Sequence, residues 1–329
     1  MATAQQLKAL IESYTEGNPE RFLSVAAQIA AHAARAGKEK LAEELRKLIN
    51  AARDRQAKSP TLGQAIPIVR PTGELSGLVA AAFPKTRLAD MVLDPVLEDR
   101  LRRVITEYRQ MERLAQHGLT PRRRLLLLGP SGTGKSMTAA ALAGELHLPL
   151  LAVQFHTLIT KFMGETAAKL RLIFDSMADN RGVYLFDEFD AIGAHRHGGT
   201  DVGEIRRVLN SFLVFVEQEE SSSIVVAATN LGHALDDALF RRFDDTLRYT
   251  LPSAAMTRRL VENRLSSFST SRLGFKRIAV TAQGMTHADI VKACEDAAKD
   301  AVLGERSAIR TDDLKRALEH RRKPDPQSP

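Results

Sequence analysis

The sequence is poor in cysteine and lacks long apolar runs, and each absence excludes a class of protein. Its 329 residues include one cysteine, Cys294, which excludes an internal disulfide and a zinc site built from several thiolates. No apolar run approaches the length of about 18 residues that a membrane-spanning helix needs. The first residues also lack the basic segment and apolar core of a secretory signal. The sequence therefore predicts a cytoplasmic protein without a membrane anchor, in which Cys294 is a buried apolar side chain of a helix over residues 289–302.

A strong excess of one charge is also missing. Lysine and arginine total 47 against 40 aspartate and glutamate residues, which gives a net charge of +7. Of the basic clusters, residues 122–124 precede an apolar run, and residues 321–323 begin a proline-containing tail, residues 322–329, that we expect to be disordered. The net charge is the one compositional feature that could suggest nucleic acid, and the positions of these clusters weaken that interpretation. A weak affinity for polyanions is left open.

The chain is longer than one typical domain, and its patterns divide it into separate units. Residues 1–57 show three helical patterns; between Phe22 and Ala33 apolar residues recur every three or four positions, so we expect a small helical module that packs on its neighbours or on a partner. Residues 58–85 contain several prolines and glycines and are predicted to be a linker. Residues 253–321 are mainly helical and form a predicted lid.

Strands alternate with helices from residue 86 to residue 252, a pattern typical of a parallel sheet covered on both faces. The expected fold class is therefore α/β: a doubly wound parallel-sheet domain that binds phosphate, with a C-terminal helical lid and a small N-terminal helical module. The candidate strands are residues 125–128, 150–155, 182–186, 224–228 and 246–251.

A full phosphate-loop motif follows the first of these strands. Residues 129–136 match G-x-x-x-x-G-K-[ST], and a predicted helix over residues 137–146 comes next. Glycines allow backbone conformations that turn consecutive N–H groups toward phosphate oxygens, and the helix dipole favours the same anion. The predicted nucleotide contacts are Pro130, Ser131, Gly132, Thr133, Gly134, Lys135, Ser136 and Met137. The sequence thus predicts a nucleoside triphosphate site, with ATP as the ligand.

Two acids end the third candidate strand. Asp187 and Glu188 follow an apolar run, and beside a triphosphate one carboxylate can bind Mg²⁺ while the other acts as a base for water. We assign Asp187 and the Ser136 hydroxyl to Mg²⁺, Lys135 to the β and γ phosphates, and Glu188 to water activation. The alternative is two solvated acids at the start of a loop.

The fourth candidate strand ends at Asn230, a neutral amide that can orient the attacking water. Soon after come Arg241 and Arg242, paired guanidinium groups that can stabilise negative charge on a γ phosphate, often that of a neighbouring molecule. A structural alternative stays open for the arginines, namely ion pairs with Asp236, Asp237 or Asp244.

Taken in order, these motifs resemble the AAA clade of AAA+ ATPases over about residues 86–321. The arginine pair without an inserted glycine is similar to the branch that contains spastin, katanin and fidgetin. The resemblance implies a homo-oligomeric ring, usually a hexamer, with ATP bound between subunits. It also implies that Arg241 and Arg242 reach the neighbour's γ phosphate and that Asn230 is the residue called sensor 1.

The same resemblance assigns further residues. Lys161, Phe162 and Met163 match the pore loop, in which an aromatic side chain grips an unfolded polypeptide. Met91 and Val92 stand where the family places the backbone that contacts adenine. His287 replaces a glycine expected near the nucleotide, where it can add a ring contact or a pH-sensitive donor. His287 and Ala288 are both expected to contact the nucleotide.

The motif H-E-x-x-H is missing, so the sequence does not indicate a membrane-anchored AAA protease, and a single phosphate loop predicts one ATPase tier. We expect an ATP-driven protein unfoldase or remodelling ATPase, with residues 1–57 docking a protein substrate or a dedicated partner. Two alternatives remain: a nucleic-acid-associated loader or switch, and a nucleotide-gated regulator of one bound protein.

Overall fold

The computed structural model describes residues 26, 29, 43, 47, 73–154, 158, 163–188, 202–230, 240–270 and 273–322; the side chains of residues 73, 74, 163, 164 and 202–207 are outside this description. The chain divides into two compact units, Met1–Ile68 and Val69–Pro329. In the first unit the described residues are helical. Most of the predicted module at residues 1–57, and the predicted tail after residue 322, lie outside the described residues.

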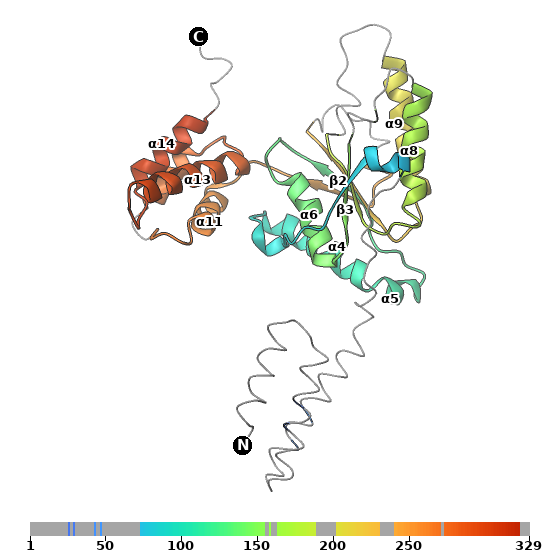
Figure 1. Ribbon diagram of the computed structural model, residues 1–329, viewed down its shortest axis with the longest axis horizontal. Helices are drawn as coiled ribbons and strands as arrows, with labels where there is room; N and C mark the ends of the chain where they lie inside the picture. Colours follow the sequence, from blue (N-terminus) through green and yellow to red (C-terminus); the bar gives the residue numbers. More distant parts are fainter. Residues whose placement is uncertain are drawn as a thin grey trace. The chain divides into compact units, whose positions relative to one another are not determined.

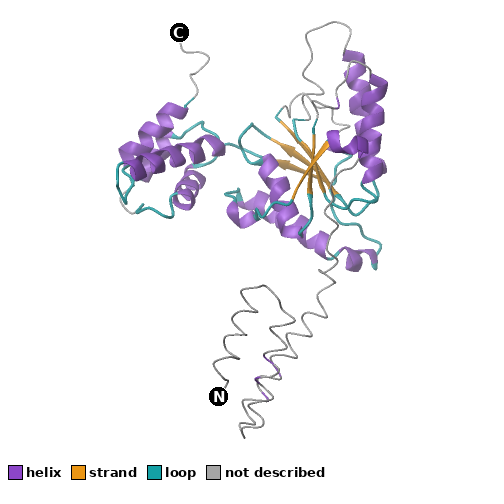
Figure 2. Ribbon diagram, in the orientation of Figure 1, coloured by secondary structure: helices purple, strands orange, loops and turns teal. Residues whose placement is uncertain are grey.

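A six-stranded sheet forms the centre of the second unit, and Figure 2 shows its strands between layers of helices. In spatial order the strands are β1 (Val79–Ala82), β3 (Leu150–Val153), β4 (Val183–Phe186), β5 (Ile224–Thr229), β2 (Arg124–Leu128) and β6 (Asp245–Arg248). All neighbours from β3 to β6 pair in parallel. Every residue of β4 and β5 is buried, as expected for a parallel sheet covered on both faces. The predicted α/β fold class is confirmed.

The predicted linker at residues 58–85 is wrong in its C-terminal part. Residues Gly73–Gly77 form a short 3-10 helix, η1, and β1 pairs antiparallel with β3, with Val79 opposite Val153. The proline and glycine content of the segment obscured this strand, which has only four residues. The sheet domain therefore begins before residue 86.

Helices cover both faces of the sheet (Figure 1). On one face α4 (Pro95–Arg109) and α6 (Lys135–Leu146) pack on the strands, and on the other face α8 (Met163–Ser176) and α9 (Val202–Gln218) do so. The short helices η2 (Leu88–Asp90) and α5 (Met111–Ala115) flank α4. Helix α4 begins at a proline behind Asp94, whose carboxylate accepts a hydrogen bond from the Val96 N–H at 3.0 Å.

Helix α8 begins at Met163, the last of the three residues that resemble the pore loop. Met163, Gly164 and Glu165 form its first turn. A glutamate is favourable there, since the N-terminal end of a helix stabilises negative charge.

The lid has its own hydrophobic core. Helices α11 (Ala254–Arg264), α12 (Phe275–Thr281), α13 (His287–Leu303) and α14 (Thr311–Arg321) enclose one apolar cluster. Cys294 is fully buried in α13 among these apolar side chains, as expected, and burial raises the pKa of its thiol to about 12. Among the described residues, no helix is long and apolar enough to cross a membrane.

Candidate nucleotide site

The phosphate loop connects β2 to α6 and has the backbone conformation that its glycines were expected to allow. Gly129, Gly132 and Gly134 have φ angles of 150°, 76° and 105°, where a side chain would cause strain. Space is restricted as well: a Cβ atom at Gly132 would lie 2.7 Å from the Thr286 hydroxyl. Hydrogen bonds fix two of the loop carbonyls: Gly132 O accepts from the Ala288 N–H of the lid at 3.0 Å, and Pro130 O accepts from the Thr133 hydroxyl of the loop itself at 2.7 Å. This loop fits a triphosphate by its conformation.

Lys135 and Ser136, the first residues of α6, connect the loop to two other strand ends. The Lys135 ammonium donates to Asn230 Oδ1 at 2.8 Å and to the Gly129 and Pro130 carbonyls at 2.7 and 2.9 Å. The Ser136 hydroxyl donates to the Asp187 carboxylate. Strand β5, which ends before Asn230, lies between β2 and β4, and the carboxyl ends of parallel strands share one edge of the sheet. The predicted site residues Lys135, Ser136, Asp187 and Asn230 are thus close together.

Ser136 and Asp187 also fit a magnesium ion. Mg²⁺ takes oxygen ligands and is bound through one or two protein groups together with substrate phosphates. A hydroxyl and a carboxylate in contact at the mouth of a phosphate loop provide such a pair. In the described part of the chain, no group of three or more His, Cys, Asp or Glu side chains could hold a metal ion, so a completed Mg²⁺ site here would need oxygens from the nucleotide and water.

Glu188 is exposed and has an unusual backbone. Its φ angle is 54°, in the left-handed region that glycine favours, and its N–H donates to Asp187 Oδ1 at 2.9 Å. A non-glycine residue held in that region is uncommon, and such residues concentrate at functional sites. This strained residue directly follows Asp187, the carboxylate that contacts Ser136.

Of the two residues expected at the adenine, Met91 lies beside the loop. Met91 and Val92 are buried; the Met91 methyl group would be 3.4 Å from a Cβ atom at Gly134, whereas Val92 packs in the lid cluster. Met137, also predicted as a contact, is 42% exposed.

His287, the first residue of α13, adjoins Thr286 and Ala288, the two lid residues against the loop. Both of its ring nitrogens are buried without a hydrogen-bond partner among the described residues, and burial lowers the pKa of the imidazole. A buried and unsatisfied polar group of this kind calls for an explanation, such as a ligand.

Arg241 and Arg242 lie at the other end of the sheet. They precede β6, and β6 runs parallel to β2, with Asp245 opposite Leu125 and Arg248 opposite Leu128. The phosphate loop follows Leu128, so a length of strand of roughly 10 Å separates it from the arginine pair. Arg242 forms an ion pair of 2.6 Å with Glu217, whereas Arg241 is exposed and has no polar partner among the described residues.

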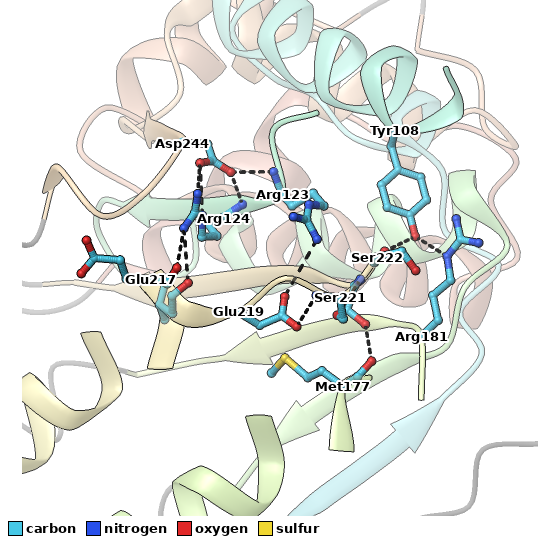
Figure 3. Close-up of polar contacts among 12 residues, drawn as sticks. Tyr108, Arg123, Arg124, Met177, Arg181, Glu217, Glu219, Ser221, Ser222 and Asp244 are labelled. Atoms are coloured by element: carbon cyan, nitrogen blue, oxygen red, sulfur yellow. Dashed lines mark hydrogen bonds and ion pairs between the residues drawn. The ribbon is translucent and has the colours of Figure 1, made fainter. Parts of the chain in front are cut away.

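The alternative that Arg241 and Arg242 form ion pairs with nearby aspartates can be tested in part. Asp236 and Asp237 lie outside the described residues, and Asp244 contacts the start of β2 instead (Figure 3). Its carboxylate accepts from the Arg123 and Arg124 N–H groups at 2.8 and 2.9 Å and pairs with the Arg124 guanidinium at 3.1 Å.

The basic cluster at residues 122–124 is neutralised within the chain. Arg122 pairs with Asp245 at 3.4 Å, and Arg123 lies 4.0 Å from the Glu219 carboxylate. Figure 3 shows Arg123 directed toward Glu219 and Arg124 toward Asp244. The cluster therefore offers little unpaired charge to a polyanion.

The predicted pore-loop residues Lys161 and Phe162 lie outside the described residues, and so does the side chain of Met163. Sequence reasoning also missed two residues, Thr138 and Tyr249, that contact the phosphate loop from within the core. A pairing between positions 111 residues apart leaves no local pattern in one sequence.

Comparison with known proteins agrees with this geometry. Residues 125–251 match the family "ATPase family associated with various cellular activities (AAA)". The chain is 33% identical over 320 residues, 97% of its length and 95% of the relative's, to an uncharacterized AAA family ATPase, y4kL, of Sinorhizobium fredii. This chain belongs to the AAA family of ATPases.

Two further matches are less similar in sequence, and the name of one of them states a function. The AAA chain is 30% identical over 236 residues to the proteasome-activating nucleotidase of Methanoculleus marisnigri; the match covers 69% of this chain and 57% of that protein. Among solved structures, the FIGL-1 AAA domain matches with a TM-score of 0.60 and 22% identity, over 80% of this chain and 94% of that chain. The structural match shows the AAA fold alone.

Proposed function

We propose that this AAA protein is an ATP-hydrolysing protein unfoldase or remodelling ATPase that acts as a homo-oligomeric ring, with a hexamer as the expected form. The observation that carries the ATPase part is the convergence of Lys135, Ser136, Asp187 and Asn230 at the ends of three adjacent strands. A lysine, a hydroxyl and a carboxylate at a phosphate loop are the groups that ATP and Mg²⁺ require.

Each group has a separate task in this proposal. The loop N–H groups and Lys135 hold the phosphates, while Met91, Val92, His287 and Ala288 lie at the nucleoside. Mg²⁺, held by Ser136 and Asp187, would neutralise charge on the phosphate oxygens. Glu188 accepts a proton from the attacking water, and Asn230 orients that water by hydrogen bonding.

The position of the arginine pair supports a shared site. Arg241 and Arg242 stand at the opposite end of the strands from their own phosphate loop, so they serve a neighbour's triphosphate and not the one bound by their own chain. Their positive charge would stabilise the transition state of phosphoryl transfer. Because no glycine is inserted at this arginine pair, we also propose that the chain belongs to the branch that contains spastin, katanin and fidgetin.

The mechanical part of the proposal concerns Lys161, Phe162 and Met163. In a ring these residues would face a central pore, where an aromatic and a flexible thioether give sequence-tolerant apolar contact with a substrate chain. Residues 1–57 would select the substrate or a dedicated protein partner. The named relative, a proteasome-activating nucleotidase, supports action on proteins.

The test separates hydrolysis from substrate handling. Partners captured by the Glu188→Gln variant with ATP are identified and then offered, with a fluorescent tag, to the wild type and to Phe162→Ala. We expect ATP-dependent unfolding of the tag by the wild type and its loss in Phe162→Ala at nearly unchanged basal ATPase rate. Release of an intact partner would instead support a nucleotide-gated regulator, and stimulation by DNA that survives Phe162→Ala would support a loader.

A further inference from the structure

Tyr249 is the residue directly after β6, and its backbone lies under the start of the phosphate loop. Its N–H donates to the carbonyl of Leu128, the last residue of β2, at 2.6 Å. A Cβ atom at Gly129 would lie 2.7 Å from the Tyr249 Cβ and would overlap its carbonyl oxygen. The first glycine of the loop is therefore in direct contact with Tyr249, and no larger residue fits there.

The Tyr249 side chain reaches the first turn of α6, directly after the same loop. Its hydroxyl lies 2.6 Å from the Thr138 hydroxyl, and both side chains are buried. Thr138 in turn places its hydroxyl 3.1 Å and its N–H 2.9 Å from the carbonyl of Gly134, the residue before Lys135. Since the Thr138 hydroxyl donates to Gly134, the Tyr249 hydroxyl donates to Thr138, and burial raises the pKa of Tyr249, which keeps it a donor.

Tyr249 is also close to the lid along the chain. Four residues later Ser253 caps α11, the first lid helix, by accepting from the Met256 N–H at 3.3 Å. The lid holds the tip of the loop as well, through the hydrogen bond from Ala288 to Gly132. The phosphate loop is thus fixed at its start and its end by Tyr249 and at its tip by α13, and both attachments belong to the lid or lead into it.

We propose that the Tyr249 and Thr138 pair positions the phosphate loop for the nucleotide and couples its shape to the lid. This proposal rests on the nucleotide site proposed above. Neither hydroxyl contacts the reacting groups; they act through Gly129 and Gly134, whose conformations set the direction of the loop N–H groups and the start of α6. Loss of the pair would loosen the loop and weaken phosphate binding more than it slows the chemical step.

The experiment measures ADP affinity, and the KM and kcat for ATP, in full-length Tyr249→Phe, Thr138→Val and the double variant, with Thr138→Ser as the conservative control. We expect each single change to weaken ADP binding and raise the KM for ATP by roughly 3- to 10-fold, with kcat changed less than about 2-fold, because a lost buried hydrogen bond has about that effect. The double variant should be no weaker than Thr138→Val alone, and Thr138→Ser should stay close to the wild type.

Unchanged ADP and ATP affinities, together with a lower melting temperature, would overturn the proposal and leave the pair a structural contact. Additive effects of the two changes would also contradict it, since the residues would then act independently. If Tyr249→Phe fails to fold, Thr138→Val and Thr138→Ser provide the same comparison. ADP binding needs no hydrolysis. A wild type that binds ADP without hydrolysing ATP would refute the proposed function, and the ADP affinities of the variants would still test the pair.

Discussion

The amide oxygen of Asn230 accepts a hydrogen bond from the ammonium of Lys135 at 2.8 Å, which joins the end of β5 to the phosphate loop. The contact places a neutral group and a positive group of separate motifs within one site. Their expected tasks differ, because the charge of Lys135 serves phosphate binding whereas the amide of Asn230 serves the attacking water.

Lys135→Ala and Asn230→Ala should therefore have separable effects. We expect Lys135→Ala to weaken ATP binding by roughly 10- to 100-fold, since a charge-assisted hydrogen bond contributes about 1.5 to 3 kcal/mol. Asn230→Ala should leave the Kd for ATP within a few-fold and lower kcat by about 10²-fold, the usual effect of a lost transition-state donor. Titration calorimetry and steady-state turnover measure the two effects.

Lys299→Ala, on the exposed face of the lid, is the control and should alter neither ATP binding nor kcat. Equal loss of binding in both site variants would contradict the division of roles.

The two arginines should also differ in their effects. Arg241 has no polar partner among the described residues, whereas Arg242 is tied to Glu217 of its own chain. We expect Arg241→Ala to lower kcat by about 10³-fold without loss of ATP binding, as for an arginine supplied by a neighbour. Arg242→Ala should have the smaller catalytic effect and a stability change of at most about 1 kcal/mol, because Glu217 is 61% exposed.

A mixing experiment tests the supply of Arg241 by a neighbouring subunit. Arg241→Ala and Lys135→Ala subunits, each impaired alone at an ATP concentration that does not saturate the Lys135→Ala site, should regain hydrolysis when mixed, since some interfaces then pair an intact loop with an intact arginine. No recovery in assembled mixed rings would contradict a shared site.

His287 predicts a specific pH dependence of stability. Burial lowers its pKa in the folded protein below the ordinary value of 6.5, so the unfolded chain binds the proton more readily. The stability due to the neutral ring is complete above about pH 6.5 and falls as the pH drops toward the folded pKa, by up to about 1.4 kcal/mol per pH unit. Urea unfolding of the wild type and His287→Gln at pH 7.5 and 5.5 should show the wild type losing more stability at low pH. Parallel loss in both proteins would contradict the assignment.

Much of the fold could be predicted because its signals are local. The apolar strands before Gly129 and Asp187 and the fixed spacing of the loop residues all depend on neighbours in sequence. Strand β1 could not be predicted, since its four residues are stabilised by pairing with β3 and not by their own pattern. The contact of Thr138 with Tyr249 likewise depends on the finished sheet. The single sequence also could not show that the Glu217 carboxylate pairs with Arg242.

The most direct test of the central claim, that this site hydrolyses ATP with Glu188 as the base, is phosphate release by the wild type and Glu188→Gln, with ATP binding measured on the same samples. We predict steady turnover by the wild type. The variant should bind ATP with unchanged affinity, form ATP-dependent oligomers and release phosphate about 10²- to 10⁴-fold more slowly, the usual contribution of a general base. Normal turnover by Glu188→Gln would contradict the account.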